Sequence, residues 1–575
     1  MSPSTDTASA AAIKIRVCIG SGCAMNGSLQ VADRLESAIA TAGADDTMHV
    51  VRTGCHGLCQ EGPIVVIDPE GTFYPCVDEH KAAAIADSLT NGTGTIAEFL
   101  YRDGPDGEPI AKYVDVPFNR IQKRIILRNC GVIDPSRIED ALERGAYAAL
   151  RKCIESMAPE QIIAEVHASG LRGRGGAGFS TGTKWRYTRE APGDTKYIIC
   201  NADEGDPGAF MDRSIVEGDP HSVLEGMAIA ARAIGATEGF VYVRAEYPLA
   251  VKHVRMAIEQ ATEQGFLGEN IMGSDLSFTV QIREGAGAFV CGEETALMAS
   301  IEGHRGMPRP RPPFPAVSGL FGKPTCINNV ETLANISWII NHGAEEYSAI
   351  GNAASKGTKV FALTGKVRHT GLVEVPMGLT VRELVFDVGG GCPGSSPAKA
   401  VQIGGPSGGC LPLELFDTPI EYEALMEAGA IVGSGGVVVV DESTCMVDLA
   451  RYFLSFTQHE SCGKCVPCRV GTKRMLEIVT RITQGKGQEG DIELLERLSL
   501  DVVRTSLCGL GQTAPNPVLT TLRYFREEYE EHIRDHRCRA GACNELSTFV
   551  IDAELCRGCD ACKKHCPASA FSGQL

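Results

Sequence analysis

Hydrophobic and polar positions change their spacing several times along the chain, and each change predicts a new structural region. Residues 13–19, 48–52 and 63–67 are short apolar runs that predict strands, whereas 28–42 has the 3.6-residue period of an amphipathic helix. A stretch rich in Gly, Asp and Pro, Tyr101–Glu108, then ends the pattern. The first hundred residues are therefore expected to form a small α/β domain.

The spacing of hydrophobic positions also divides the rest of the chain into domains. Helical patterns such as 221–235 alternate with strands such as Lys196–Cys200 and Gly239–Val243, which predicts an α/β-layered domain. The next region is rich in Val, Thr and Gly, and the one after it has a helical period. The expected domains are 1–100, 120–345, a β-rich domain at 358–441, a helical domain at 443–532 and a tail at 533–575.

Composition and charge narrow the class of protein. The 575 residues include 54 basic and 72 acidic ones, a net charge of −18 that argues against nucleic-acid binding. No apolar run approaches the roughly 20 residues of a membrane helix, so we expect no membrane insertion and a cytoplasmic protein. The chain has 23 cysteines, and no signal peptide is recognisable. Metal ligation is therefore favoured over disulfides.

Four cysteines lie on two loops of the first domain. Cys18 and Cys23 end the first predicted strand, and Cys55 and Cys59 follow the strand at 48–52. A [2Fe–2S] cluster needs two sulfurs per iron, which this set supplies, although zinc also binds four cysteines. The pattern resembles the thioredoxin-like [2Fe–2S] ferredoxin domain. Cys76 lies outside it and is expected to be an ordinary buried thiol.

A second set lies in the helical region. Cys462, Cys465 and Cys468 follow C-x2-C-x2-C, which places three thiolates around a [4Fe–4S] cube. Cys508, which follows a helical segment, can supply the fourth ligand.

The tail has a ferredoxin run, C-x2-C-x2-C-x3-C-P, formed by Cys556, Cys559, Cys562 and Cys566. In two-cluster ferredoxins the fourth cysteine of such a run binds the other cluster. No second run follows here, so either these four hold one cluster or the tail is shortened, and the sequence leaves both open.

A further group precedes the tail. His532, Cys538 and Cys543 are wrongly spaced for a cubane but suit tetrahedral zinc, with Cys445 as a possible fourth ligand. The alternative is four unrelated residues, and the sequence does not favour either. If zinc binds, we expect it to tether the tail as a mobile arm near the Cys462 cluster.

Five segments carry candidate ligand chemistry. Leu171–Trp185 contains G-x-G-x-x-G at Gly173, Gly175 and Gly178, with Arg172, Arg174 and Lys184 to meet phosphate charge. Because Ile162–Ser169 predicts a helix where a Rossmann unit has a strand, that unit is doubtful and a plain glycine turn remains possible. The other segments are Asn201–Arg213 after a predicted strand, Glu284–Leu297 running into a helix, the proline-rich Arg309–Pro315, and Asn328–Thr332.

These segments, in this order and followed by Glu460-Ser-Cys-Gly-Lys-Cys465, closely resemble the FMN- and NADH-binding flavoprotein subunit of NADH dehydrogenases. That family includes the complex I subunit and the diaphorase subunits of soluble hydrogenases and formate dehydrogenases, and the resemblance covers about 120–530. It implies a multidomain α/β fold with a thioredoxin-like [2Fe–2S] domain, a Rossmann-like FMN domain, a small β-grasp-like domain, a helical bundle with [4Fe–4S] and a ferredoxin-like tail.

The resemblance also implies roles for residues. FMN would contact Gly173, Arg174, Gly175, Gly176, Gly178, Lys184, Asn201, Asp203, Gly292, Glu293, Asn328 and Asn329. NAD(H) would stack on Phe179, Tyr187 and Phe314 and meet Glu294 and Arg311, and the residues nearest the chemistry would be Glu204, Asp206 and Glu294. Asp206 stands where Glu is commoner, which leaves NAD against NADP open. The remaining cysteines of this domain, Cys200, Cys291 and Cys326, are expected to be packing residues.

The two terminal iron–sulfur regions are absent from the plain complex I subunit. Their presence resembles the fused flavoprotein subunits of trimeric, often electron-bifurcating, iron hydrogenases and related formate dehydrogenases or transhydrogenases. FMN would convert a two-electron hydride into single electrons for the clusters. The expected partners are a small thioredoxin-like [2Fe–2S] subunit, a larger catalytic subunit of hydrogenase or formate dehydrogenase type, and ferredoxin. The alternatives are the NADH-input subunit of a respiratory complex and, from another class, a non-enzymatic electron relay.

Overall fold

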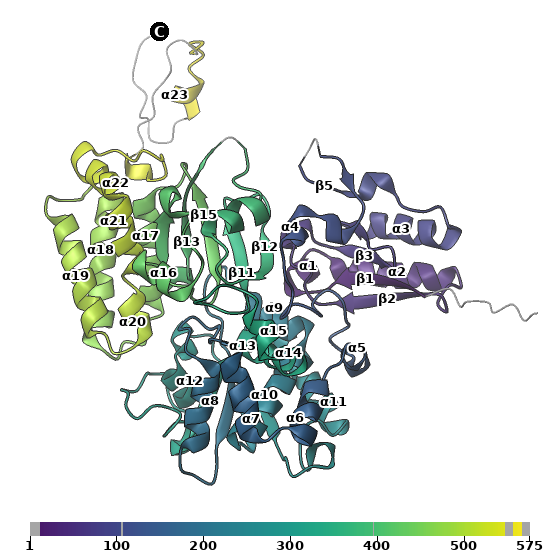
Figure 1. Cartoon of the computed structure of the whole chain (residues 1–575). Coiled ribbons are helices and arrows are strands. Elements are labelled where there is room, and N and C mark those ends of the chain that lie inside the picture. The colour runs from purple at the N-terminus through teal and green to yellow at the C-terminus, as the bar shows by residue number, and fades with distance from the viewer. Residues whose placement is uncertain (1–11, 105–106, 395, 547–555, 566–575) are drawn as a thin grey trace, which may run out of the picture.

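Three β-sheets organise the chain, one in each of the first three regions (Figure 1). The computed structural model describes residues 12–104, 107–394, 396–546 and 556–565. The fourth region is helical, as its period predicts. Residues 556–565 of the tail contain a short helix that stands apart from the other domains (Figure 1).

The N-terminal domain is a four-stranded sheet in the order β2-β1-β3-β4. β1 pairs with β2 in parallel and with β3 antiparallel, which confirms the three predicted strands. Two helices, α2 and α3, pack together beside it, and α3 and β4 were not expected from the pattern. The bounds are Ile13–Cys18 (β1), Ser21–Met25 (α1), Ser28–Thr41 (α2), Met48–Thr53 (β2), Val65–Asp68 (β3), Thr72–Tyr74 (β4) and Glu79–Asn91 (α3). A hairpin of β5 (Tyr101–Arg102) and β6 (Pro109–Ile110) follows.

The central domain has a fully parallel sheet in the order β10-β7-β8-β9. Its central helix, α10 (Pro220–Ile234), begins with Pro at its first position and with Asp219 accepting a hydrogen bond from the Ser222 amide, and ends at left-handed Gly235. Because other helices pack around it, nearly every α10 residue is buried. The strands are Tyr197–Ala202 (β7), Glu238–Arg244 (β8), Thr279–Gly285 (β9) and Thr325–Asn329 (β10).

Short helices complete this domain on both sides of the sheet. Their bounds are Pro117–Arg120 (α4), Ile138–Glu143 (α5), Ala148–Ser156 (α6), Pro159–Ala168 (α7), Thr181–Glu190 (α8), Met211–Gly218 (α9), Pro248–Glu263 (α11), Glu294–Ile301 (α12), Val330–Ala334 (α13), Ile336–His342 (α14) and Ala344–Ser348 (α15). The helix α7 precedes the glycine loop, as the sequence predicted, so the loop connects two helices and not a strand to a helix.

The third region has a five-stranded sheet in the order β12-β11-β15-β13-β14. A β11–β12 hairpin lies at one edge and β15 runs parallel to β11 in the middle, which is the β-grasp topology that was expected. The bounds are Thr358–Gly365 (β11), Gly371–Pro376 (β12), Ala398–Ile403 (β13), Gly409–Pro412 (β14), Tyr422–Glu427 (α16) and Gly436–Asp441 (β15).

The helical region packs around a core of its own, with α17 against α18 and α21. The bounds are Met446–His459 (α17), Thr472–Thr483 (α18), Asp491–Thr505 (α19), Gly509–Thr513 (α20), Asn516–Tyr524 (α21) and Arg526–Glu530 (α22), and the tail helix is Ala561–His565 (α23). A π-helical turn, Pro467–Gly471, precedes α18.

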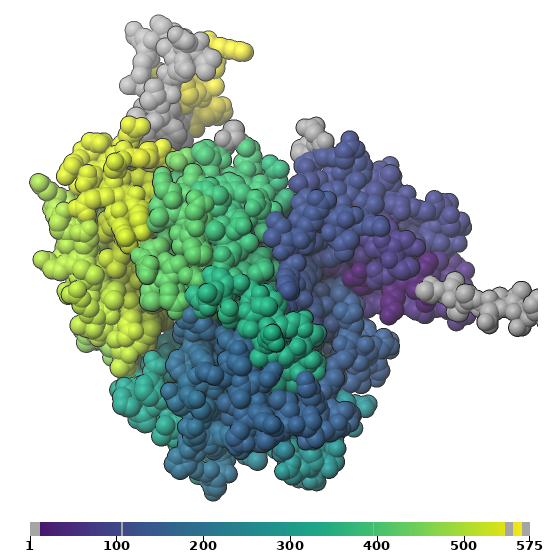
Figure 2. Space-filling model, viewed as in Figure 1, coloured from purple at the N-terminus to yellow at the C-terminus, as the bar shows by residue number. Residues whose placement is uncertain are grey.

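The domains are in direct contact (Figure 2). The N-terminal domain bonds the central domain through Ser21 Oγ and the Glu217 carboxylate (2.5 Å), and it bonds the β-grasp domain through the Leu372 amide and the Gly57 carbonyl (2.8 Å). Among the described residues, no helix combines the length and apolar character needed to cross a membrane.

Candidate functional site

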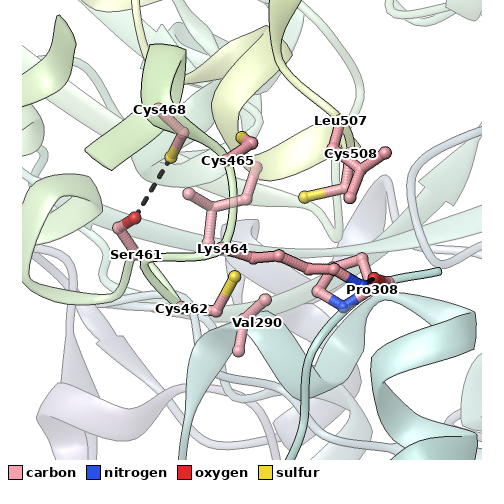
Figure 3. A pocket seen from close by; sticks show the side chains of 10 residues that line it. Val290, Pro308, Ser461, Cys462, Lys464, Cys465, Cys468, Leu507 and Cys508 are labelled. Carbon is pink, nitrogen blue, oxygen red and sulfur yellow. Dashed lines mark hydrogen bonds between the residues drawn. The ribbon is translucent and has the colours of Figure 1, made fainter. Parts of the chain in front are cut away.

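The [4Fe–4S] ligands predicted from the sequence line one pocket. The pocket contains Cys462, Cys465, Cys468 and Cys508, although Cys508 lies 40 positions beyond the others, at the N-terminus of α20 (Figure 3). Its other lining atoms are mostly apolar, and the Lys464 ammonium donates to the Pro308 carbonyl (2.6 Å) at its edge. Four thiols in an apolar pocket beside a cation fit a negatively charged cubane.

This pocket adjoins the nucleotide domain. Val290 lies on its wall and belongs to the short helical turn Phe289–Gly292, which carries one of the predicted FMN residues. The Phe289 amide donates to the Glu460 carboxylate (2.8 Å), and the Phe289 ring packs edge-on against Phe456 of α17. One turn thus contacts the cluster pocket and the flavin segments, which is the proximity that electron transfer needs.

The glycine loop lies at the carboxyl ends of the parallel strands. Asn201 on β7 and Asn329 on β10 are paired neighbours there. A Cβ atom on Gly175 would lie 3.1 Å from the Asn329 Cβ, and one on Gly176, whose φ is +119°, would lie 3.2 Å from Gly433 of the β-grasp domain. The loop therefore presents backbone without side chains to a ligand. One side of it is closed by Gly433 of the β-grasp domain, which the sequence did not suggest as a site residue.

Those missed residues had a signal in the sequence. Gly433–Gly436 is a glycine-rich turn before β15, and within it the Ser434 hydroxyl donates a hydrogen bond to the Asp206 carboxylate. Tyr422 of α16 donates to the Gly173 carbonyl (2.9 Å). The β-grasp domain is thus part of the site wall.

The Arg174 side chain is occupied by protein partners. Its side chain is 1% exposed, and its guanidinium donates to the carbonyls of Thr358 (3.0 Å) and Lys356 (2.6 Å) and to the Tyr347 hydroxyl (3.2 Å). These bonds tie the glycine loop to β11 and leave the charge unavailable to a phosphate. Arg172 is also engaged, since it forms an ion pair with Glu423 (2.8 Å).

Lys184 is the third cation suggested for phosphate. Its ammonium is half-buried and donates to the Ile327 carbonyl (3.0 Å) beside Asn328. Asn328 accepts a bond from the buried Trp185 indole (2.9 Å), so α8 and the end of β10 are fixed together.

Two carboxylates after β7 have strongly perturbed acidity. Burial raises the pKa of Asp203 to about 7; its Oδ1 lies 3.4 Å from Arg244, and its Oδ2 has no hydrogen-bond partner among the described residues. Burial likewise raises the pKa of Asp206 to about 6. A buried carboxylate oxygen without a partner, next to a glycine cradle, fits a site completed by a ligand.

Glu204 has a different arrangement. Its carboxylate oxygens accept bonds from the backbone amides of Asp212 (3.0 Å) and Arg213 (3.1 Å) at the start of α9, and burial raises its pKa to about 7. Asp212 in turn accepts a bond from the Asn329 amide nitrogen (2.5 Å). Glu204 therefore fixes the start of α9, which holds Asn329.

The residues expected at the nucleotide are accessible. Phe179, Tyr187 and Phe314 are each about half exposed, at 49%, 51% and 56%. The three rings are therefore accessible to a stacking ligand. Glu294 and Arg311 form an ion pair (2.5 Å).

Glu293 has a structural role in the same segment. Its carboxylate accepts bonds from the Thr295 (2.9 Å) and Ala296 (3.0 Å) amides and so caps α12. Gly292 lies directly before it, and a Cβ there would come within 3.3 Å of the Asp203 carbonyl. Asn201 donates to the Gly292 carbonyl (2.9 Å), which joins this segment to the end of β7.

The four N-terminal cysteines also come together. The Cys55 and Cys59 sulfurs are 3.7 Å apart, and hydrogen bonding to the thiols of Cys23 and Cys55 raises the pKa of the Cys18 thiol. A Cβ on Gly62 would lie 2.5 Å from the Cys23 sulfur, so the loop leaves room for that sulfur only because Gly stands there. This compact S4 set fits a [2Fe–2S] cluster.

The other cysteines give one correction. Cys76 is exposed, not buried as expected, because it lies in the turn between β4 and α3. Cys200, Cys291 and Cys326 are buried in the central domain, as predicted. Of the tail run, Cys556, Cys559 and Cys562 are exposed, and Cys566 lies outside the described residues.

Cys445, His532, Cys538 and Cys543 form a single buried cluster. Their ligand atoms all lie within 4.8 Å of one another. His532 Nε2 is 3.4 Å from both the Cys445 and Cys543 sulfurs, while its Nδ1 bonds the Glu528 carbonyl (2.6 Å). That second bond orients the ring as in many metal sites, so the four residues are not unrelated.

Known families match the chain in the same order as these sites. A thioredoxin-like [2Fe–2S] ferredoxin model matches residues 6–90, the Nuo51 FMN-binding domain matches 166–338, the NADH-ubiquinone oxidoreductase-F iron–sulfur binding region matches 448–532, and a 4Fe–4S binding domain matches 549–572.

Relatives and solved structures agree. The chain is 55% identical over 452 residues to the NADP-reducing hydrogenase subunit HndC of Solidesulfovibrio fructosivorans, covering 79% of this chain and 92% of that one. It is 46% identical to a subunit of an NADH-quinone oxidoreductase of Rhizobium meliloti (strain 1021), covering 72% and 98%. A chain of an air-oxidized NAD+-reducing [NiFe]-hydrogenase superposes with a TM-score of 0.63 at 30% identity, covering 95% of this chain and 87% of that chain.

Sites, families and relatives therefore lead to one conclusion. The chain belongs to the family of FMN-binding flavoprotein subunits of NADH dehydrogenases and is an NAD(P)H dehydrogenase flavoprotein with FMN, [2Fe–2S] and [4Fe–4S] centres.

Proposed function

We propose that this subunit transfers electrons between a nicotinamide nucleotide and a hydrogenase-type partner in an electron-bifurcating complex. The observation that carries the proposal is the presence of every cysteine set on one chain, with the N-terminal set docked against the flavin domain through Glu217. A respiratory NADH-input subunit is the second candidate, favoured by the relatives that are NADH-quinone oxidoreductase subunits. Those relatives match 68–72% of this chain, whereas the hydrogenase chain aligns with 95% of it.

The residues of the flavin site have distinct proposed roles. Bound FMN would accept hydride and release single electrons. The bare backbone at Gly173, Gly175, Gly176 and Gly178 would border the FMN, and Lys184 would supply charge there. Asn201, Asn328 and Asn329 would orient it from the strand ends. The Asp203 oxygen that lacks a partner among the described residues would accept a hydrogen bond from it.

The nucleotide would enter over the three exposed rings. Phe179, Tyr187 and Phe314 would stack on the adenine, and Glu294 and Arg311 would exchange their mutual ion pair for contacts with its hydroxyl and phosphate groups. Asp206, held by Ser434, would accept a bond from the nicotinamide ribose. Glu204 is a positioning residue in this scheme, not a catalytic one, because α9 occupies its carboxylate.

We further propose that Cys445, His532, Cys538 and Cys543 bind zinc. Three sulfurs and one imidazole nitrogen in a buried cluster suit tetrahedral zinc, and their spacing does not suit a cubane. Zinc there would tie the start of α17 to the segment before the tail and give the tail cluster a fixed pivot beside the helical domain. Movement about that pivot would gate electron exit toward ferredoxin or a partner subunit.

The test is the electron balance of the purified complex. NADH and reduced ferredoxin supplied together should support hydrogen evolution, and either alone should not. If NADH alone suffices, the complex is a simple diaphorase, and if a quinone is reduced instead, the respiratory alternative holds.

A further inference from the structure

Arg124, Arg128 and Arg144 surround a cavity that none of the proposed flavin, nucleotide or metal residues lines. Its volume is about 220 Å³. Its walls come from the segment before α5, the turn before α6, the start of α10 and the helix α14. The helices α6, α10 and α14 pack against one another at this position (Figure 1).

The three guanidinium groups lack carboxylate partners among the described residues. Arg128 donates to the Ile125 carbonyl (2.7 Å) and the Ser337 hydroxyl (3.0 Å), and Arg144 donates to the Asn129 side-chain oxygen (3.3 Å). Arg124 donates to the carbonyl of His56 (2.7 Å). In a chain with a net charge of −18, three such arginines around one cavity create a local positive site.

Two carboxylates also line this cavity, but other donors occupy them. Asp219 accepts bonds from the Ser222 amide (3.3 Å) and the Asn129 side-chain nitrogen (2.8 Å). Glu225 accepts one from the Leu150 amide (3.1 Å), and burial raises its pKa to about 7, so part of its population is uncharged near neutrality. Neither carboxylate forms a direct ion pair with these three arginines among the described residues. The charge of Arg128 still acts on Glu225, where it opposes the rise in pKa that burial causes, so what remains for a ligand is mainly the guanidinium of Arg144 together with the free hydrogen-bonding capacity of Arg128.

The size and polarity of the cavity limit the ligand. A volume near 220 Å³ is below the roughly 300–1,000 Å³ of pockets for drug-sized molecules, so the cavity fits a small ligand better than a whole nucleotide or lipid. Ser222, Ser337 and Asn341 add hydroxyl and amide groups to the lining. Guanidinium groups match the geometry of phosphate and carboxylate oxygens through paired hydrogen bonds.

We propose that this cavity binds a small multivalent oxyanion, either inorganic phosphate or a short di- or tricarboxylate. Arg144, which is exposed at the mouth, and Arg128, which is half-buried on the wall, would hold the oxygens. Arg124 also lines the cavity and donates to the His56 carbonyl in the loop between Cys55 and Cys59, so one side chain contacts both the cavity and the N-terminal cluster domain. The site is separate from the flavin and does not depend on the proposed function.

Calorimetric titration of the holoprotein tests this site, with phosphate in one arm and citrate in the other. We expect saturable binding in at least one arm, and the tighter arm identifies the source of the oxyanion. Arg144→Ala should weaken that binding at least about tenfold, equivalent to about 1.4 kcal/mol, and Arg144→Lys should weaken it less. Arg151→Ala is the matched control, because Arg151 is exposed on α6 and pairs with Glu155 (3.6 Å), away from the cavity lining.

Each outcome decides the matter. Absence of saturable heat with both anions overturns the proposal, as does equal binding by Arg144→Ala and the parent protein. Flavin and iron contents are measured in every variant. Because Arg144 is exposed, these contents should stay at the parent level, and Arg128→Gln provides a second variant that should also weaken binding.

Discussion

At the scale of single residues, Gly175 is the position that we propose sets the space available beside the FMN. A Cβ there already approaches Asn329 to 3.1 Å, and the branched methyls of valine would extend further into the cradle. Overpacking of this kind costs about 1–3 kcal/mol, so Gly175→Val should lose roughly 10- to 100-fold in FMN affinity. The flavin content of purified protein and its NADH–dye activity measure the loss.

Gly175→Ala provides a graded comparison, since its single methyl needs only a small shift of Asn329. A Gly175→Val protein that keeps full flavin and full NADH–dye activity would show that this loop does not border the FMN.

Asp206 should give the activity a pH dependence. Its pKa is raised to about 6 by burial, so it is ionised and able to accept a ribose hydroxyl only above that pH. We expect kcat/KM for NADH to fall as pH falls through about 6, and Asp206→Asn to remove this inflection. The reverse holds for stability: the unfolded carboxyl has a pKa near 3.9, so this group's contribution declines as pH rises from about 4 to 6. An unchanged pH profile in Asp206→Asn would contradict the assignment.

Arg174 shows that the hydrogen-bond partners of a side chain cannot be predicted from sequence when they lie far along the chain. Its position in a glycine loop suggested a phosphate contact, but its partners Lys356 and Thr358 lie more than 180 positions away and come close only through the docking of β11. Phe179 and Phe314 were named from sequence motifs in their own segments, and their exposure leaves stacking on a nucleotide as a prediction.

At the scale of elements, the turn at Pro467–Gly471 and the start of α20 bring Cys468 and Cys508 together. Cys468→Ala should remove the [4Fe–4S] signal from the EPR spectrum. NADH should still reduce FMN in this variant, but transfer to a partner should fall by orders of magnitude. Cys392→Ala is a suitable control, since this half-buried thiol lies outside every cysteine set. An unaltered cluster inventory in Cys468→Ala would falsify the ligand assignment.

The buried cluster of Cys445, His532, Cys538 and Cys543 gives a second prediction, which concerns how α17 is attached to the tail. Cys538→Ser combined with Cys543→Ser should lose zinc and keep all iron, as measured by elemental analysis. Because zinc would hold α17 to the segment after α22, proteolysis between 535 and 546 should also become faster. Cys76→Ser, at an exposed thiol, is the control. If iron falls and the parent contains no zinc, the cluster binds iron and the hinge proposal is wrong.

Periodicity predicted those helices and strands well whose apolar residues recur at a regular spacing. It placed β1, β2 and α10 within one or two residues, and it recognised the helix before the glycine loop. It left the Cys445 cluster undecided, because Cys445 lies at the start of α17, His532 in the helical turn after α22, and Cys538 and Cys543 in the loop beyond, and only their packing shows the proximity. Apolar residues also pack at that junction: Leu546 is buried in the helical core.

At the scale of the whole molecule, the attachment of the N-terminal domain determines whether its cluster can exchange electrons with the flavin. Neither domain's sequence indicates this interface. It includes backbone contacts, such as Gly57 with Leu372, side-chain bonds such as Arg16 to the Gly131 carbonyl (2.7 Å), and the buried Glu217 carboxylate, which accepts bonds from the amide (3.1 Å) and hydroxyl (2.5 Å) of Ser21. Glu217 ends the same α9 helix whose start is fixed by Glu204, so α9 connects the flavin loop to the N-terminal cluster loop.

The bond between Ser21 and Glu217 should therefore hold the two domains together. Charged hydrogen bonds contribute about 1.5–3 kcal/mol, so Glu217→Ala should raise hydrogen exchange in β1 and α1 of the holoprotein by roughly tenfold or more. Ser21→Ala should give a smaller effect, and the double variant should add little to Glu217→Ala, because the two residues act through one contact. Ser37→Ala, on the exposed face of α2, should change nothing. Additive effects of the two variants, or exchange equal to the parent's, would mean that other contacts, such as the bond from Arg16 to the Gly131 carbonyl, hold the domains together.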